Sequence, residues 1–423
     1  MKEDIQETRL ENGLVILTDR MQGVRSATLG FFFRVGSRHE PAHLNGISHF
    51  IEHTVFKGTQ KRTALEIAIE TDRLGGNLDA FTTHEETGFA IKVIDDQLPQ
   101  AFDLIADMLA NPLFTQADLK SEQRVIIEEM KMIEDSPEEY LGEIFSEAFF
   151  PDHPLGMSIA GTPRSVKSFG HERTRTYHEQ VFNASNLVIT AAGNIEHSQI
   201  VALSEKFFDS SLDTHHTSLS APPTTAAPII IKHNTNLEQA HLVIATPLVS
   251  GCDERRYAAD VMANIIGGST SSRLWQKVRE ERGLAYSVGA SAISYQDCGM
   301  FSIFAATSPE QVAEVVDLSI AEMRNVVNDG VTEDELELAK QQAVASILLS
   351  LEDSAARAAT LAQSEMTHAR QISVEETLAK LEAVTTDEIL LLAREFFRTE
   401  NVAFAALGDL KRLKIERERL KIV

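Results

Sequence analysis

Short apolar runs alternate along the chain with long amphipathic stretches, and both patterns occur twice. In segment 182–194 a polar turn precedes the apolar run from Leu187 to Ala192, which ends at a glycine. Segment 397–409, which begins 215 residues later, repeats this order and also ends at a glycine turn. An apolar run of this length before a glycine is typical of a buried strand. The repetition therefore predicts two copies of one structural unit.

Two helical patterns also correspond to each other. One begins at Thr115 and reaches Ser136, and the other begins at Thr332 and reaches Ser354. In both, the threonine is followed by acidic residues, which indicates the start of a helix. Predicted strands such as residues 14–17 are mixed with these helices without strict alternation. We therefore expect the α+β class.

A segment rich in Ser, Thr and Pro, without hydrophobic periodicity, separates the two copies. Such a composition is typical of a linker. We predict a first half at residues 1–212, a linker at 213–228 and a homologous second half at 229–423. Each half is expected to hold a mixed sheet and several helices.

The composition is that of a soluble globular protein with more than one domain. The chain has 423 residues, of which 43% are hydrophobic and 24% charged. No apolar run approaches the roughly 18 residues of a membrane helix, and the N-terminal residues show no apolar signal region. Cys252 and Cys298 are too few for a disulfide framework. These features predict a cytoplasmic protein.

The formal net charge is −24. A negative field of this size disfavours nucleic acid and anionic membranes as partners and favours cationic ligands. Simple solubility explains the same charge, so the charge alone identifies no ligand.

Residues 49–53 read His-x-x-Glu-His, the inverted form of a well-known zinc-helix motif. Residues four apart lie about 40° apart around an α-helix, so His49 and His53 share one face and can reach one ion. Glu52 lies beside them and can contact a water on the metal without being a ligand. Two histidines on any helix give the same pattern, so a third ligand must support the interpretation.

A catalytic zinc site needs that third protein ligand and keeps one position for water. Glu122 and Glu129 lie seven residues apart on the helix that begins at Thr115, so their carboxylates share a face. One of them can bind the metal while the other supports a ligating histidine. Glu128 points about 100° away from both. Spacing alone does not choose between Glu122 and Glu129.

The motif and the residues that follow it, Phe56-Lys57-Gly58-Thr59, resemble the pitrilysin–insulinase family of zinc metallopeptidases, most closely its processing-peptidase branch. The resemblance covers essentially the whole chain and implies two halves that enclose a central chamber. It also implies that Glu129 is the third ligand and that Glu122 supports a histidine. One zinc ion (Zn2+) per chain is then held by His49, His53 and Glu129.

A glycine turn at residues 75–76 precedes a predicted strand that contains Asp79, Ala80 and Phe81. The resemblance implies that this strand is a sheet edge beside the metal and that the substrate adds to it as a further strand. Main-chain pairing reads extended backbone, so unfolded peptides are the expected substrates. The family usually has Asn where this chain has Asp79, which leaves the contact of that side chain open. Phe81 also fits a plain half-buried strand residue.

The second half lacks the His-x-x-Glu-His motif, and Ser346 occupies the position that corresponds to Glu129. A helix is predicted from Arg273 to Gly283, followed by a strand. By resemblance, Arg279 and Tyr286 reach the peptide at the metal, where Tyr286 can donate to the developing oxyanion and Arg279 can fix a backbone carbonyl. The alternative is structural, because an arginine in the last turn of a helix compensates the helix dipole.

Together these features predict a zinc-dependent endopeptidase that hydrolyses short or unfolded peptides, with basic or extended segments as substrates. Glu52 is expected to act as general base on a zinc-bound water, and Glu122, Arg279 and Tyr286 to assist. The alternative is a non-catalytic partner subunit of a heterodimeric processing peptidase, although this chain keeps the residues that such subunits lose. A metal buffer would need Cys-rich ligands. The sequence permits a homodimer and does not decide the oligomeric state.

Overall fold

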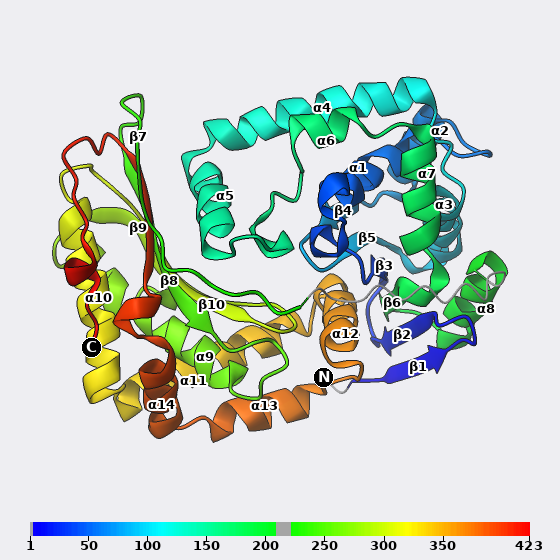
Figure 1. Cartoon of the computed structure of the whole chain (residues 1–423). Coiled ribbons are helices and arrows are strands. Elements are labelled where there is room, and N and C mark those ends of the chain that lie inside the picture. The colour runs from blue at the N-terminus through cyan, green and yellow to red at the C-terminus, as the bar shows by residue number, and fades with distance from the viewer. Residues whose placement is uncertain (1–2, 209–220) are drawn as a thin grey trace. The chain divides into compact units, whose positions relative to one another are not determined.

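The computed structural model describes residues 3–208 and 221–423 and divides into two compact units (Figure 1). The first unit comprises Met1–Lys131, Met157–Ala221 and Leu348–Ser373, and the second comprises Met132–Gly156, Pro222–Ile347 and Val374–Val423. Each unit holds one mixed sheet with helices packed on it, which confirms the predicted α+β class. Residues 213–220 of the predicted linker lie outside the described residues, and residues 221–228 form no helix or strand.

The first unit contains a six-stranded sheet in the order β1-β2-β6-β3-β5-β4. Only β2 and β6 run parallel among its neighbouring strands, and the other pairs are antiparallel. The strands are β1 (Ile5–Arg9), β2 (Val15–Arg20), β3 (Ser26–Phe33), β4 (Leu78–Thr82), β5 (Thr87–Ile94) and β6 (Leu187–Gly193).

The second unit repeats this arrangement in five strands, in the order β7-β11-β8-β10-β9. Its single parallel pair, β7 with β11, stands where β2 and β6 stand in the first sheet. The strands are β7 (Ile229–His233), β8 (Ala240–Leu248), β9 (Ala285–Ser294), β10 (Gly299–Thr307) and β11 (Ala403–Gly408). The repeated segments 182–194 and 397–409 contain β6 and β11, so the predicted repeat of structural units is confirmed.

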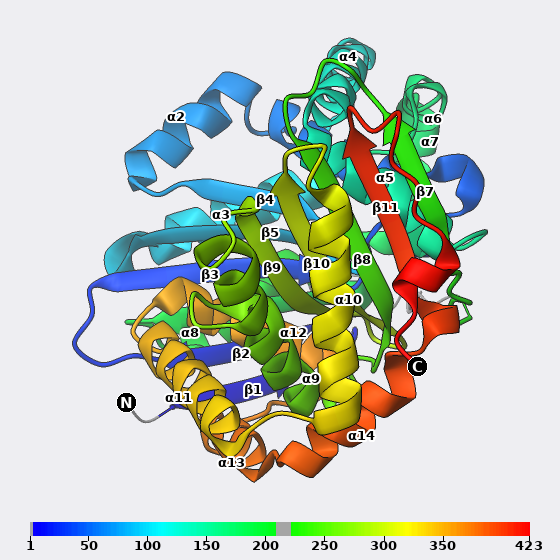
Figure 2. The ribbon, with the colours of Figure 1, turned by 90° about the vertical axis from the view of Figure 1, so that its left-hand side faces the viewer.

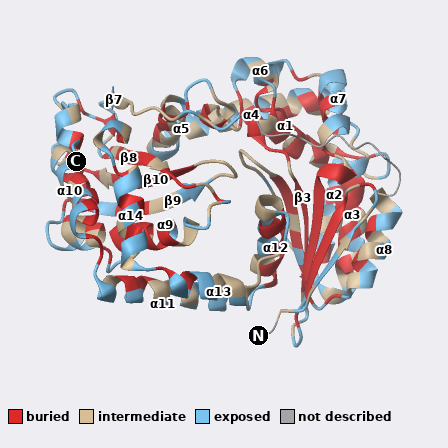
Figure 3. Cartoon of the chain, turned by 60° about the horizontal axis from the view of Figure 1, so that its bottom comes forward, coloured by how far each residue is buried: buried red, intermediate tan, exposed pale blue. Residues whose placement is uncertain are grey.

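A layer of helices covers one face of the first sheet and encloses a continuous apolar core with it. Figure 3 shows β3 and its neighbours as buried strands, and their core-facing side chains include Leu29, Phe31 and Phe89. Contacts to the sheet come from α1, α3 and α8. The helices are α1 (Ile47–Thr54), α2 (Ala64–Leu74), α3 (Leu98–Ala110), α6 (Pro163–Lys167), α7 (His171–Val181), α8 (His197–Phe208) and α12 (Ser354–His368).

The second sheet is covered in the same way on one face by α9, α10 and α14, as Figure 2 shows for α9 and α10. Its core includes Ile244 and Phe301 from the strands and Val316 and Ile389 from the helices. The helices of this unit are α5 (Pro137–Phe149), α9 (Arg256–Ala263), α10 (Val312–Asp329), α13 (Val374–Ala383) and α14 (Thr386–Phe396). Two long helices, α4 (Gln116–Asp135) and α11 (Glu333–Ser350), each cross the boundary between units along the chain. No helix in residues 3–208 and 221–423 is long and apolar enough to cross a membrane.

The second face of each sheet is covered by a helix from the other half of the sequence. Helix α12, which lies in the C-terminal half of the chain, packs on β2, β3 and β6, and α5, from the N-terminal half, packs on β8 and β11. Each of these helices follows the long helix that carries the chain across the unit boundary. The two halves thus exchange one helix each.

Charged groups fasten α12 to the first sheet. The fully buried carboxylate of Glu365 accepts two hydrogen bonds from Arg9, at 2.7 and 2.9 Å, and one from Arg34 at 2.7 Å. Arg357 donates to the buried Asp19 at 2.7 Å. Arg357 and Asp19 are both buried, and breaking such a pair by removing one partner costs about 3–5 kcal/mol, so this pair strongly fixes the position of the helix.

Aromatic side chains fasten α5 to the second sheet instead. Phe145 and Phe149 stack with ring centroids 5.3 Å apart, and Phe149 meets Phe150 edge to face at 4.8 Å. They pack against Ala245 and Ala405 of the sheet. The small strand residues leave room for the rings, so this contact is almost wholly apolar.

The compact units therefore differ from the predicted halves in two segments. Residues 132–156 pack with the second unit, and residues 348–373 pack with the first. The physical reason is that an amphipathic pattern indicates a helix with one apolar face but does not indicate which sheet that face covers.

The exchange predicts how a divided chain behaves. If residues 1–212 and 221–423 are produced as separate chains, each alone lacks the helix that covers one face of its sheet and should not unfold cooperatively. Produced together, they should copurify and recover cooperative unfolding, as size-exclusion chromatography and circular dichroism can measure. Glu365→Ala in the second piece should weaken the association, because Arg9 and Arg34 lose their buried partner. Two pieces that fold independently and do not associate would contradict the exchange.

Candidate metal centre and the residues around it

Helix α1 carries the His-x-x-Glu-His motif, and its start is fixed by backbone geometry. Gly46 precedes the helix with φ of 92°, a left-handed conformation that favours glycine. A Cβ atom at this position would lie 2.5 Å from the carbonyl oxygen of Ala160, so there is no space for any larger residue. Ile47, Phe50 and Ile51 are fully buried on the opposite face and anchor the helix in the core.

The buried carboxylate of Glu40 caps this helix. Its two oxygens accept hydrogen bonds from the backbone N–H groups of Gly46 and Ser48, both at 2.7 Å, and Asn45 approaches at 3.4 Å. These donors are among the N–H groups that the first turn of a helix leaves without partners. Burial raises the pKa of Glu40 to about 7, and the two backbone hydrogen bonds act against that rise.

His49 and His53 project from α1 toward Glu129 on α4. The distance from Nε2 of His53 to Oε2 of Glu129 is 3.5 Å, and that from Nε2 of His49 to the same oxygen is 3.8 Å. One donor atom from each of the three residues lies within 4.8 Å of the other two. Among residues 3–208 and 221–423 this is the single group of three or more His, Cys, Asp or Glu residues arranged in this way.

These donors fit a zinc ion. Ligands about 2.0–2.1 Å from a tetrahedral zinc lie about 3.4 Å from one another, close to the two distances measured here. The oxygen of Glu129 that faces both imidazoles is buried and accepts no hydrogen bond from the described part of the chain. Burial, and then the neighbouring His53, lower the pKa of His49 to about 4, which keeps its imidazole neutral as a metal ligand requires.

Glu122 supports the site from the same helix as Glu129. Its Oε2 atom lies 3.4 Å from Nδ1 of His53, and its Oε1 atom lies 2.8 Å from Nζ of Lys57. Its side chain is only 4% exposed. Lys57, Glu122 and His53 thus form a chain of contacts that orients one imidazole, the usual role of a carboxylate behind a ligating histidine.

Glu52 lies on α1 between the two histidines and is 9% exposed. The hydroxyl of Thr82, at the end of β4, donates to Oε2 of Glu52 at 2.6 Å. Burial raises the pKa of Glu52, and the hydrogen bond from Thr82 and the charge of His53 oppose this rise. The raised pKa makes the carboxylate a stronger base, and the hydrogen bond from the neutral Thr82 hydroxyl orients it.

Strand β4 is the edge of the first sheet, and it packs against α1. The side chains of Asp79 and Phe81 are exposed, whereas Ala80 is half-buried. Phe81 lies against Phe32, with ring centroids 6.2 Å apart, and a Cβ atom on Gly88 would come within 2.6 Å of its ring. Asp79 accepts a short hydrogen bond from Asn77. All three predicted substrate residues therefore lie on β4, the strand whose Thr82 donates a hydrogen bond to Glu52.

Arg279 and Tyr286 lie together in the second unit. The guanidinium carbon of Arg279 is 4.8 Å from the ring centroid of Tyr286 and 4.1 Å from that of Trp275, and Tyr286 is 78% exposed. The predicted helix here differs from an α-helix, since Trp275–Glu280 winds as a π-helix. The wider turn places Trp275 and Arg279 in stacking contact, and the sequence analysis did not single out Trp275.

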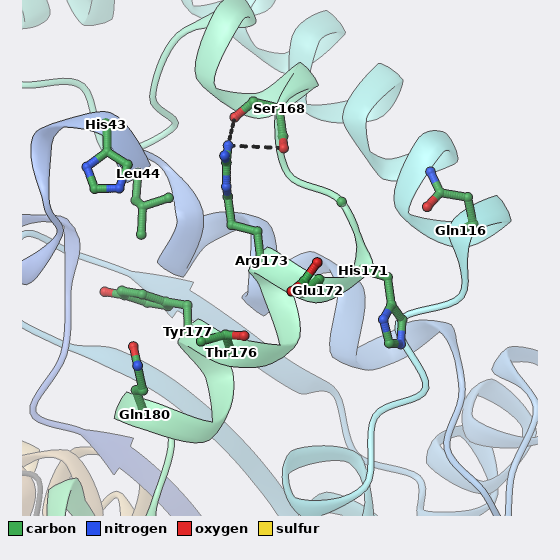
Figure 4. Close-up of a pocket in the computed structure, with 11 residues that line it drawn as sticks. His43, Leu44, Gln116, Ser168, His171, Glu172, Arg173, Thr176, Tyr177 and Gln180 are labelled. Atoms are coloured by element: carbon green, nitrogen blue, oxygen red, sulfur yellow. Dashed lines mark hydrogen bonds between the residues drawn. The ribbon is translucent and has the colours of Figure 1, made fainter.

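A separate hollow of about 690 Å³ lies along α7 (Figure 4). Its lining includes Arg173, which donates to the carbonyl and hydroxyl of Ser168, and Tyr177, which lies 3.3 Å from the hydroxyl of Ser48. None of the predicted site residues lines this hollow. We therefore do not assign it as the catalytic site, although it is large.

Three residues of the metal-site region were missed in the sequence: Glu40, Lys57 and Thr82. Lys57 stands in the segment that carries the family resemblance, but its sequence position gives no sign of its contact with Glu122. Glu40 and Thr82 reach α1 from a preceding loop and from a strand 30 residues later. A helix that starts without Ser, Thr, Asp or Asn at its first cap position is one signal that a distant acceptor is needed.

The fold and these donors define a two-unit α+β protein in which one unit brings the His-x-x-Glu-His motif together with a glutamate from a helix more than 60 residues later in the sequence. The chain belongs to peptidase family M16, the insulinase family. Residues 15–163 match the family model described as "Insulinase (Peptidase family M16)", and residues 168–343 match the model described as "Peptidase M16 inactive domain".

Bacterial proteins named as uncharacterized zinc proteases are similar to this chain over nearly its whole length. One from Streptomyces coelicolor is 36% identical over 414 residues, which cover 96% of this chain and 90% of that protein. YmxG of Bacillus subtilis is 36% identical over 404 residues, which cover 96% of this chain and 98% of YmxG. The names of these relatives assign them to the zinc proteases.

Two solved structures share the fold. A protease from Helicobacter pylori gives a TM-score of 0.88 at 20% identity and covers 96% of this chain and 100% of its own. The structure titled as the peptidase M16 inactive domain from Pseudomonas fluorescens gives a TM-score of 0.89 at 18% identity and covers 97% of this chain and 100% of its own. At such low identity the likeness supports the two-unit fold.

The raised pKa of Glu40 predicts a pH-dependent contribution to stability. The group binds its proton more tightly in the folded protein, with a pKa of about 7 against an ordinary value of 4.5. The folded state therefore loses stability from this group as pH rises from about 4.5 to about 7, by roughly 3 kcal/mol. Glu40→Gln has no titrating group here, so the wild type should lose stability relative to the variant over this range.

Urea unfolding of both metal-free proteins at pH 4.5, 5.5, 6.5 and 7.5 measures this difference. Histidines that titrate in the same range are present in both proteins and cancel in the comparison. Parallel curves for the two proteins would show that Glu40 keeps its ordinary pKa in the fold.

Proposed function

We propose that this protein is a zinc-dependent endopeptidase, with one zinc ion per chain held by His49, His53 and Glu129. The observation that carries the proposal is the buried oxygen of Glu129, which has no hydrogen-bond partner in the described chain and lies 3.5 and 3.8 Å from the two imidazoles. Glu52 is placed beside this group without joining it. Membership of peptidase family M16 supports the same chemistry.

When bound, zinc supplies Lewis-acid activation of water and of the peptide carbonyl. Glu52 takes the proton from the attacking water and delivers it to the leaving amine. Its raised pKa suits both transfers, because a group that holds a proton more tightly than an ordinary carboxylate is a stronger base. Glu122 and Lys57 hold His53 in place during both steps.

The substrates that fit best are short or unfolded peptides. Strand β4, which contains Asp79, Ala80 and Phe81, is an open sheet edge with which an extended peptide can pair. The net charge of −24 favours peptides with basic segments. In this proposal Tyr286 donates to the developing oxyanion, and Arg279, which contacts the rings of Trp275 and Tyr286, fixes a peptide carbonyl.

The second candidate is a non-catalytic partner subunit. Its support is the match of residues 168–343 to a model named for an inactive domain. Against it, the first unit retains the two histidines and Glu129 in one group, with Glu122 in contact with His53 and the general-base candidate Glu52 on the same helix as the histidines. We therefore favour the enzyme and propose that it works in the cytoplasm, as a monomer or homodimer.

The metal site is tested by a pair of neighbouring substitutions. Glu129→Ala should lower zinc affinity by more than about 100-fold, since loss of even a supporting residue costs about 10–100-fold. Glu128→Ala is the matched control, because Glu128 is exposed and pairs with Lys131 on the surface. The zinc affinity of each variant is measured from its zinc content after dialysis and from competition with a chelator. Equal zinc in the two variants would remove Glu129 from the ligand set.

The general base is tested by Glu52→Gln, which keeps the size of the side chain but cannot take a proton. The variant should keep its zinc and its thermal stability and lose at least about 100-fold in kcat. A quenched peptide with a basic segment, assayed with and without chelator, gives the rate. Hydrolysis at the wild-type rate would reject Glu52 as the base, and chelator-insensitive hydrolysis would reject the metal mechanism.

A further inference from the structure

Thr82 joins two parts of the site through one residue. Its hydroxyl donates to Glu52 at 2.6 Å, and its backbone is the last position of β4, the edge strand of the first sheet. Glu52 accepts no other hydrogen bond from the described residues 3–208 and 221–423. The direction of the carboxylate therefore depends on where Thr82 stands.

The register of the hairpin shows where the backbone of Thr82 points. The N–H of Thr83 donates to the carbonyl of Glu86 at 2.7 Å, so these two residues occupy a hydrogen-bonded position of the ladder, although the carbonyl of Thr83 accepts from the N–H of Ser37. Hydrogen-bonded pairs alternate with non-hydrogen-bonded pairs along an antiparallel ladder. Thr82 and Thr87, the next pair, are therefore non-hydrogen-bonded, and the N–H and C=O of Thr82 point away from β5.

Ala80 has the same orientation, two residues earlier. The backbone groups of Ala80 and Thr82 thus lie on the open edge, where no further strand of the sheet follows. A peptide that adds to β4 must pair with these groups. The same residue that pairs with the peptide then holds the carboxylate of Glu52 through its side chain.

We propose that Thr82 is a positioning residue that couples the pairing of a peptide along β4 to the orientation of Glu52. The inference rests on the proposed function, because it assigns Glu52 as the base. An edge strand is held by hydrogen bonds on one side only, and an added peptide strand holds it on both. The peptide therefore fixes Thr82, and Thr82 fixes the carboxylate at the moment when its position matters.

Neighbouring threonines do not share this arrangement. The hydroxyl of Thr83 accepts hydrogen bonds from the N–H groups of Glu85 and Glu86 within the turn. The hydroxyl of Thr87, opposite Thr82 in the register, donates to the carbonyl of Val35 at 2.7 Å. Loss of either hydroxyl leaves the contact with Glu52 intact, so Thr87 provides a matched control.

The experiment compares Thr82→Val, Thr82→Ser and Thr87→Val in the full-length zinc-loaded protein. Valine keeps the shape of threonine but not its donor, and serine keeps the donor. We expect Thr82→Val to lose about 10- to 100-fold in kcat, the scale for a misplaced reacting group, with KM within about twofold and zinc content unchanged. Thr82→Ser should recover most of that loss. Thr87→Val should lower the melting temperature, because a buried carbonyl loses its donor, and keep kcat.

Three outcomes would overturn the inference: a wild-type kcat in Thr82→Val, an equal loss in Thr82→Ser, or an equal loss of kcat in Thr87→Val. The inference and the proposed function fail separately. If Glu52→Gln is inactive while Thr82→Val is fully active, the base stands and the coupling falls. If Glu52→Gln is itself active, the proposed function falls.

Discussion

The buried carboxylate of Glu40 decides where helix α1 begins, and the candidate metal site takes its geometry from that helix. Two hydrogen bonds of 2.7 Å hold the N–H groups of Gly46 and Ser48, and only glycine fits at the cap, because a Cβ atom there would clash with the carbonyl oxygen of Ala160. A slip of one residue would rotate the helix by about 100° and carry both imidazoles away from Glu129. The buried carboxylate of Glu40 therefore costs free energy, but it fixes the positions of the two imidazoles relative to Glu129.

Much of the site could be predicted from the sequence because its core is local. The spacing of His49, Glu52 and His53 needs only helical geometry, and Glu122 and Glu129 share a face for the same reason. The choice of Glu129 over Glu122 came from a family resemblance, since both carboxylates satisfy the spacing. The structure now separates the two by contact: Glu129 meets both imidazoles, and Glu122 meets one imidazole and Lys57.

The parts that could not be predicted depend on contacts between distant segments. The strands repeated at β6 and β11 were found because a buried strand shows its own pattern, and the α+β class follows from such patterns. The sequence does not show which sheet α5 and α12 cover, because the apolar face of a helix can pack on either sheet. In the same way, nothing near Thr82 in the sequence signals its hydrogen bond to Glu52, and a sequence pattern of period 3.6 does not distinguish the π-helix at Trp275 from an α-helix.

Because α12 is synthesised late, the exchange of helices also affects when the first unit can complete its fold. All strands of the first sheet have been synthesised by Gly193, whereas α12 begins at Ser354, 161 residues later. At about 5–20 residues per second, the face of that sheet on which α12 packs stays uncovered for on the order of ten seconds. During this interval Val15, Leu17 and Val188 lack the helix that covers them, and Asp19 lacks its partner Arg357. Most of the first unit is thus synthesised before the second, but it emerges from the ribosome without one of its helices and is completed only when nearly the whole chain has been made.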